Sequence, residues 1–137
     1  MKSTLLATAF ALTATAALAG SHGMAPMVEA EDQSVENGIV SASKVMAGEN
    51  GWLVVHRTDA DMKPGPVVGY APLRGGKTED VAVILQEDVM AGDMLMLMVH
   101  SEEGGTKKGI FEYTLGAKED GPIKPDGKLV MTVITAE

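Results

Sequence analysis

One short stretch in the second half of the chain most restricts its fold: residues 93–100 read Asp-Met-Leu-Met-Leu-Met-Val-His. Strict alternation places two sets of apolar side chains on opposite faces of an extended strand. One face carries Leu95, Leu97 and Val99, and the other carries Met94, Met96, Met98 and His100. The run is too short for a buried helix and is bounded by glycine and acidic residues. We therefore expect a central strand that is buried on both faces.

Other stretches with strand character follow one another along the chain, with turn signals between them. We expect further strands at 28–35, 39–46, 52–56, 67–70, 80–86, 110–115 and 129–135. Asn37-Gly38 is the strongest hairpin signal, and the Pro- and Gly-rich residues 58–77 indicate a long loop around one short extended piece. Seven or eight short strands without a helical period predict an all-β, immunoglobulin-like antiparallel β-sandwich. A β-barrel is the alternative, but the irregular loops favour the sandwich.

The first 19 residues have the pattern of a secretory signal peptide. Met1-Lys2 is a short basic start, an uncharged apolar run follows, and Ala17-Leu18-Ala19 matches a cleavage site. The apolar run is shorter than the roughly 20 residues that a transmembrane helix needs. We therefore expect a periplasmic or secreted protein with no membrane span after the signal is removed. A flexible arm would then cover residues 20–27, and a single domain residues 28–137.

Composition excludes several classes of function. The chain has no cysteine, so a disulfide framework, a thiolate metal site and a blue-copper site are all excluded. A formal net charge of −8 disfavours nucleic acid and anionic membranes as partners and favours cations. The usual hydrolase and nucleotide-binding motifs are absent from the sequence. We therefore expect a protein that is not an enzyme.

A family resemblance covers nearly the whole chain after the signal. It rests on residues 51–56, the turn at 64–70, the strands at 81–85 and 95–100, and the turns at 120–122 and 126–127. These stretches resemble an uncharacterised family of exported β-sandwich domains found in archaeal surface proteins and bacterial periplasmic proteins. The resemblance implies a sandwich fold. It assigns no activity to any residue.

The N-terminal arm suggests a copper site. Cleavage after Ala19 would leave Gly20-Ser21-His22 at a free amino terminus. The amine, two deprotonated amides and the imidazole of such a sequence provide the planar nitrogen ligands that Cu(II) and Ni(II) prefer. A histidine also occurs at this position by chance, and a shift of one residue in cleavage would destroy the site.

The methionine face of the central strand suggests a second copper site. Thioethers are soft ligands that select Cu(I), and Met94, Met96 and Met98 share one face with His100. His56 ends a neighbouring apolar strand and would be a further ligand. The alternative is ordinary packing, because methionine often fills gaps in cores and histidine often hydrogen-bonds at strand ends.

Two functions are therefore open. The first is a non-catalytic exported binding or interaction module, whose partner is an unknown periplasmic or cell-surface molecule. For that function we expect the partner surface in the loop at 58–77, with Tyr70 and Arg74 as contact residues. The alternative is a periplasmic copper-binding protein that uses the arm and the Met/His face. Copper is the one cofactor that the sequence suggests.

Overall fold

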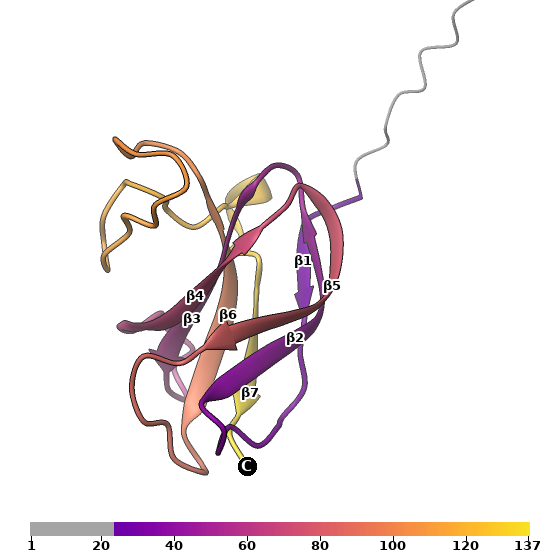
Figure 1. The fold of residues 1–137 in the computed structure, drawn as a ribbon, viewed down its shortest axis with the longest axis vertical. Helices are drawn as coiled ribbons and strands as arrows, with labels where there is room; N and C mark the ends of the chain where they lie inside the picture. The colour runs from indigo at the N-terminus through magenta and orange to yellow at the C-terminus, as the bar shows by residue number, and fades with distance from the viewer. Residues whose placement is uncertain (1–23) are drawn as a thin grey trace, which may run out of the picture.

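The computed structural model of this chain describes residues 24–137, which form two antiparallel β-sheets packed against each other (Figure 1). The strands are β1 (Met27–Glu29), β2 (Ile39–Ala47), β3 (Gly51–Thr58), β4 (Val67–Leu73), β5 (Gly76–Ile84), β6 (Met94–Ser101) and β7 (Met131–Thr135). One sheet has the order β1-β2-β5 and the other β4-β3-β6-β7. The all-β sandwich prediction is confirmed. The predicted signal peptide and Gly20-Ser21-His22 lie outside the described residues.

Strand β6 is central, as its sequence predicted. It pairs with β3 along its whole length, from Thr58 opposite Met94 to Gly51 opposite Ser101, and with β7 on its other side. Leu95, Leu97 and Val99 face the space between the sheets and are at most 2% exposed. The predicted burial of both faces is also confirmed, because Met96 and Met98 on the other face are fully buried.

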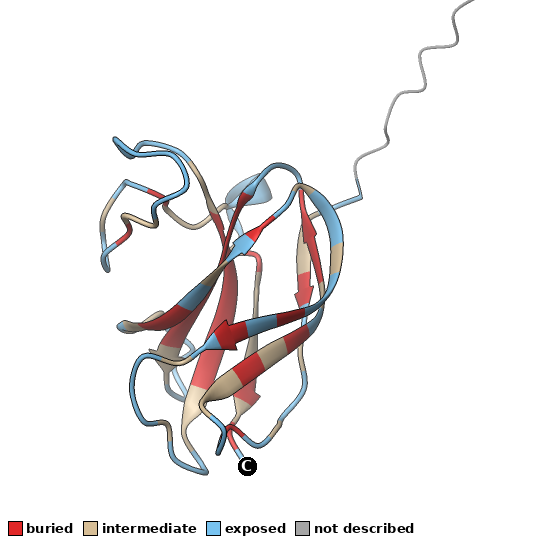
Figure 2. Cartoon of the chain, viewed as in Figure 1, coloured by how far each residue is buried: buried red, intermediate tan, exposed pale blue. Residues whose placement is uncertain are grey.

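The main core fills the space between the two sheets, where bands of buried residues cross the strands (Figure 2). Its fully buried members outside β6 are Val40, Ala42, Val45, Leu53, Val55, Val68 and Val83. They alternate with less buried residues on β2 and β5, because each of these strands presents only one face to the core. Across residues 24–137 no helix is long and apolar enough to cross a membrane.

The first strand is shorter than predicted. Only Met27–Glu29 pair with β2, and an irregular connection leads from them to the turn at Asn37-Gly38. That turn is present: the Gly38 N–H donates to the Val35 carbonyl at 2.9 Å, and Gly38 has a φ of 73°. The turn leads into β2. It does not close a long two-stranded hairpin, because residues 30–36 before it form no strand that pairs with β2.

The predicted long loop at 58–77 is largely strand. Residues 59–66 form the loop, while β4 and the start of β5 occupy most of the rest. Pro72 is tolerated inside β4 because β4 is at the edge of its sheet, where the missing N–H costs no inter-strand hydrogen bond.

The strand predicted at 110–115 was wrong. These residues belong to a long irregular segment at 102–130 between β6 and β7, interrupted by a short 3₁₀ turn at Pro125–Gly127. Phe111 and Tyr113 lie on either side of Glu112, a spacing found in strands, but they pack on aromatic and histidine rings of the four-stranded sheet. The two aromatic side chains therefore mark the side of an irregular segment that packs on the sheet.

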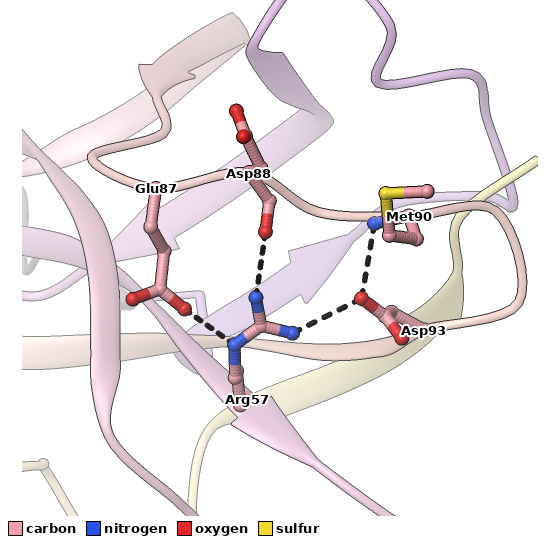
Figure 3. A network of polar contacts seen from close by, with 5 residues as sticks. All are labelled: Arg57, Glu87, Asp88, Met90 and Asp93. Atoms are coloured by element: carbon pink, nitrogen blue, oxygen red, sulfur yellow. Dashed lines mark hydrogen bonds and ion pairs between the residues drawn. The ribbon is translucent and has the colours of Figure 1, made fainter.

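At the end of the sandwich where β6 begins, Arg57 holds the connection between β5 and β6 (Figure 3). Its guanidinium donates to Glu87, to the Asp88 carbonyl at 2.8 Å and to Asp93 at 3.1 Å. Asp93 also accepts the Met90 N–H at 3.0 Å. This N–H first, and then Arg57, lower the pKa of Asp93. The network fixes the chain where it enters β6.

Candidate functional site: a buried histidine pair under an aromatic cover

The outer face of the four-stranded sheet carries the residues of interest. In the register of β3 and β6, Trp52 lies opposite His100, Val54 opposite Met98, and His56 opposite Met96. His56 and His100 are therefore on one face, with the Val54–Met98 pair between them. All six side chains are buried, although they point away from the main core.

A covering segment, residues 102–121, buries this face. Tyr113 packs edge-on against both histidine rings, with centroid distances of 4.6 Å to His100 and 5.9 Å to His56. The ring centroid of Phe111 lies 4.3 Å from that of Tyr70 and 5.4 Å from that of Trp52. In Figure 1 this orange segment extends from one end of the sandwich. It gives the sheet a second, smaller buried layer.

Two carboxylates hold the covering segment in shape. Glu112 accepts hydrogen bonds from the Thr106 hydroxyl at 2.8 Å and the Lys107 N–H at 3.1 Å. Asp120 accepts the Glu112 N–H at 2.8 Å. These N–H and O–H donors lower the pKa of Glu112, whereas burial raises that of Asp120. The segment is thus braced by hydrogen bonds to side chains rather than by a strand ladder.

The two histidine rings meet head to head. His56 Nε2 and His100 Nε2 are 3.2 Å apart, and the ring planes are inclined by 28°. On the far side of each ring, Nδ1 contacts a backbone carbonyl: Gly65 at 2.8 Å for His56, and Asp120 at 2.7 Å for His100. A carbonyl oxygen only accepts hydrogen bonds, so both Nδ1 atoms carry hydrogen. In the neutral rings, both Nε2 atoms are then unprotonated.

Burial decides the charge of this pair. It lowers the pKa of His56, against the effect of the Gly65 hydrogen bond, and lowers that of His100 to about 4. At neutral pH, two nitrogen lone pairs therefore face each other without a proton between them. Two acceptors cannot hydrogen-bond to each other, but two unprotonated ring nitrogens can bind the same cation.

The structure brings together only part of the predicted metal-ligand set. His56 and His100, 44 residues apart in sequence, are in contact. Met96 and Met98 are fully buried on the same face, whereas Met94 is partly exposed opposite Thr58, at the end of β6 away from His100. Within the described part of the chain, no group of three His, Cys, Asp or Glu residues is placed to hold a metal ion. Gly20, Ser21 and His22 are outside that part.

A surface cleft lies beside this buried layer. Its volume is about 570 Å³, and its walls include Glu49, Asn50, Trp52, Pro72, Leu73 and Lys108. Tyr70, Pro72 and Arg74 are exposed on one face of β4 and its end, so the predicted contact residues adjoin the cleft. Tyr70 is 39% exposed and packs against Trp52 and Phe111.

Comparison with known proteins places the chain in a family. Residues 26–137 match the family model described as "Domain of unknown function (DUF7282)". The chain belongs to this family. No curated protein and no solved structure matches it. The sequence prediction of an uncharacterised family is thereby confirmed.

Sequence reasoning missed several residues of this DUF7282 domain. Gly65 and Asp120 orient the histidines through backbone carbonyls, which no side-chain pattern reveals. Phe111 and Tyr113 were interpreted as strand residues. Few aromatics occur in this chain, and two of them lie two residues apart in a polar, Gly-containing stretch. That spacing is the one signal that favours a covering segment.

Proposed function

We propose that this DUF7282 domain is a non-catalytic exported module that binds a partner on β4 and in the adjoining cleft. One observation carries the proposal: Tyr70 and Arg74 lie next to a cleft of about 570 Å³ with Trp52, Pro72 and Leu73 in its walls. Tyrosine, tryptophan and arginine are the side chains that most often dominate binding energy at interfaces. Export rests on the N-terminal sequence pattern alone.

The cleft suits a polymer with both apolar and polar groups, such as an extended peptide segment. Its apolar wall is formed by β3 and β4, and its charged rim by Glu49, Glu102 and Lys108. A rigid sheet on one side and turns on the other is a common arrangement for loop-based recognition. No catalytic sequence motif accompanies the cleft, which supports binding rather than chemistry.

The first test removes the contact side chains. We expect Tyr70→Ala combined with Arg74→Ala to weaken binding to a partner recovered from exported proteins by about 10-fold or more, since each hot-spot truncation costs over about 1 kcal/mol. The measurement is titration of purified partner, after recovery by cross-linking to the native chain. Ile84→Ala, a change at a 73% exposed residue of β5, is the matched control.

The partner surface would be wrong if the double variant bound as tightly as the control. Because Tyr70 packs on Phe111, its removal also perturbs the covering segment. Arg74→Glu avoids this problem, because it reverses an exposed charge without altering any packed ring. The proposal requires that this variant also bind the partner more weakly than the native chain does.

Copper binding is a second candidate function, favoured by the contact between His56 and His100. Its N-terminal component remains a prediction about residues outside the described part. If cleavage leaves Gly20 as a free amine, we expect one equivalent of Cu(II) to bind near neutral pH and produce a visible d–d band. His22→Ala, or one residue added before Gly20, should abolish the band and leave thermal unfolding unchanged. Calorimetry without Cu(II) binding, on a chain whose mass shows Gly20 first, would disprove this site.

A further inference from the structure

We infer that His56 and His100 form a buried Cu(I) site, with their two Nε2 atoms and the thioether of Met98 as ligands. The inference rests on the copper-binding function proposed above. It concerns the folded sandwich, and it is independent of the N-terminal arm.

The ring orientations are those of metal-binding histidines. A ligating histidine usually donates its other ring N–H to a carbonyl or carboxylate, which fixes the tautomer and makes the free nitrogen more basic. Both rings have this arrangement here, through Gly65 and Asp120 at 2.8 Å and 2.7 Å. The two free nitrogens therefore converge in a form ready to bind a cation.

The separation of the two nitrogens fits a bent site. Two metal–nitrogen bonds of about 2.0–2.1 Å span the 3.2 Å between the Nε2 atoms at an N–metal–N angle of about 100°. A bent pair leaves room for a third donor. Met98 is the sulfur-bearing residue that lies between His56 and His100 in the strand register, and it is fully buried. A thioether with two imidazoles is a soft, neutral donor set.

The apolar surroundings of the two histidines favour a monovalent ion over a divalent one. Val54, Met98 and Tyr113 are buried around the rings, and among residues 24–137 no Asp, Glu or third His joins them as a metal ligand. The Born cost of burying an ion rises with the square of its charge, so a dication without an anionic ligand is strongly disfavoured. Zn²⁺ also requires four ligands, and Cu(II) a tetragonal set. Cu(I) is monovalent and accepts soft ligands.

The covering segment lies over the pair, and its Tyr113 packs edge-on against both rings. A metal ion can enter when the covering segment opens, because that segment is held by hydrogen bonds near the surface rather than by a strand ladder.

The test uses the processed chain with His22→Ala, which removes the histidine of the arm and leaves two in the protein. Cu(I) is supplied as an acetonitrile complex without oxygen. We expect one equivalent to shift the Nε2 resonances of both remaining histidines in ¹⁵N-labelled protein. X-ray absorption should show two nitrogen ligands and one sulfur ligand. Competition with a Cu(I) chelator should show that His56→Gln and His100→Gln each lose over about 100-fold in affinity, more than changes to outer-shell residues cause.

Two methionine variants test the third ligand. Met98→Leu conserves volume and should keep the fold, lose the sulfur signal and weaken Cu(I) binding by about 10-fold or more. Met94→Leu is the matched control and should bind as the His22→Ala chain does, because Met94 lies opposite Thr58 at the other end of β6.

The possible failures differ from each other. If Cu(I) shifts neither ring in the His22→Ala chain while Cu(II) still gives the d–d band with the native processed chain, the histidine-pair site is wrong and copper binding by the arm stands. If both rings shift but Met98→Leu has no effect, the assignment of the third ligand is wrong. If neither Cu(I) nor Cu(II) binds to the native processed chain, both copper proposals are wrong.

Discussion

Gly51→Ala is expected to destabilise the domain by about 3 kcal/mol or more, which corresponds to a decrease in Tm of about 10 °C or more. A Cβ atom at Gly51 would lie 2.2 Å from the His100 carbonyl oxygen and 3.3 Å from its carbon. Both atoms belong to the backbone, so no side-chain rotation relieves the clash. The pairing between β3 and β6 would have to open at this end, and His100 would move with it.

Gly48→Ala is the matched control for this prediction. Gly48 lies three residues earlier in the turn before β3, and a Cβ atom there would have no neighbour within 4 Å. Chemical denaturation of both variants should therefore give a large loss for Gly51→Ala and a small change for Gly48→Ala. Equal stabilities would mean that the close approach of β3 and β6 at Gly51 is incorrect.

Acidification is expected to destabilise the metal-free domain through the histidine pair. In the folded chain, burial lowers the pKa of His100 from its ordinary 6.5 to about 4, and lowers that of His56 as well. The unfolded chain therefore binds more protons, and stability falls as the pH decreases. The contribution of His100 is complete above about pH 6.5 and is lost towards pH 4. Each pKa unit corresponds to about 1.36 kcal/mol, so this contribution of His100 to the free energy of unfolding is about 3 kcal/mol.

Other groups also titrate in this range, so the prediction concerns a difference between variants. Asp120 shares the covering segment, and its raised pKa makes folding more favourable as the pH falls. Asp93 and Glu112 have lowered pKa values and act in the opposite direction. Urea denaturation from pH 7 to pH 4.5 should show a shallower pH dependence for His100→Gln than for the native chain. Parallel curves would contradict the buried, neutral state of His100.

The sandwich and its central strand could be predicted because they depend on local patterns. Alternation at residues 94–100 defines two faces, and the structure buries Leu95, Leu97 and Val99 in the core as predicted. Asn37-Gly38 likewise forms a turn because glycine readily adopts positive φ. Such patterns identify strands. They do not identify which stretches pair with one another.

The errors arose where one local pattern is compatible with two environments. Residues 110–115 alternate as a strand does, yet they cover a sheet without pairing with it. Pro72 and its neighbours indicated a loop, but an edge strand tolerates proline. In both cases, the deciding factor was whether another strand lies alongside, and that depends on contacts with residues distant in sequence.

The candidate site divides in the same way between sequence and structure. The sequence by itself determined that His100 shares a face with Met96 and Met98, because side chains on a strand repeat every two residues. Only the tertiary structure decided that His56 Nε2 lies 3.2 Å from His100 Nε2, across 44 residues. That distance depends on the register of β3 against β6 and on the carbonyls of Gly65 and Asp120, which orient the rings. A local sequence pattern encodes neither the strand register nor the positions of these two carbonyls, because both result from the packing of the whole chain.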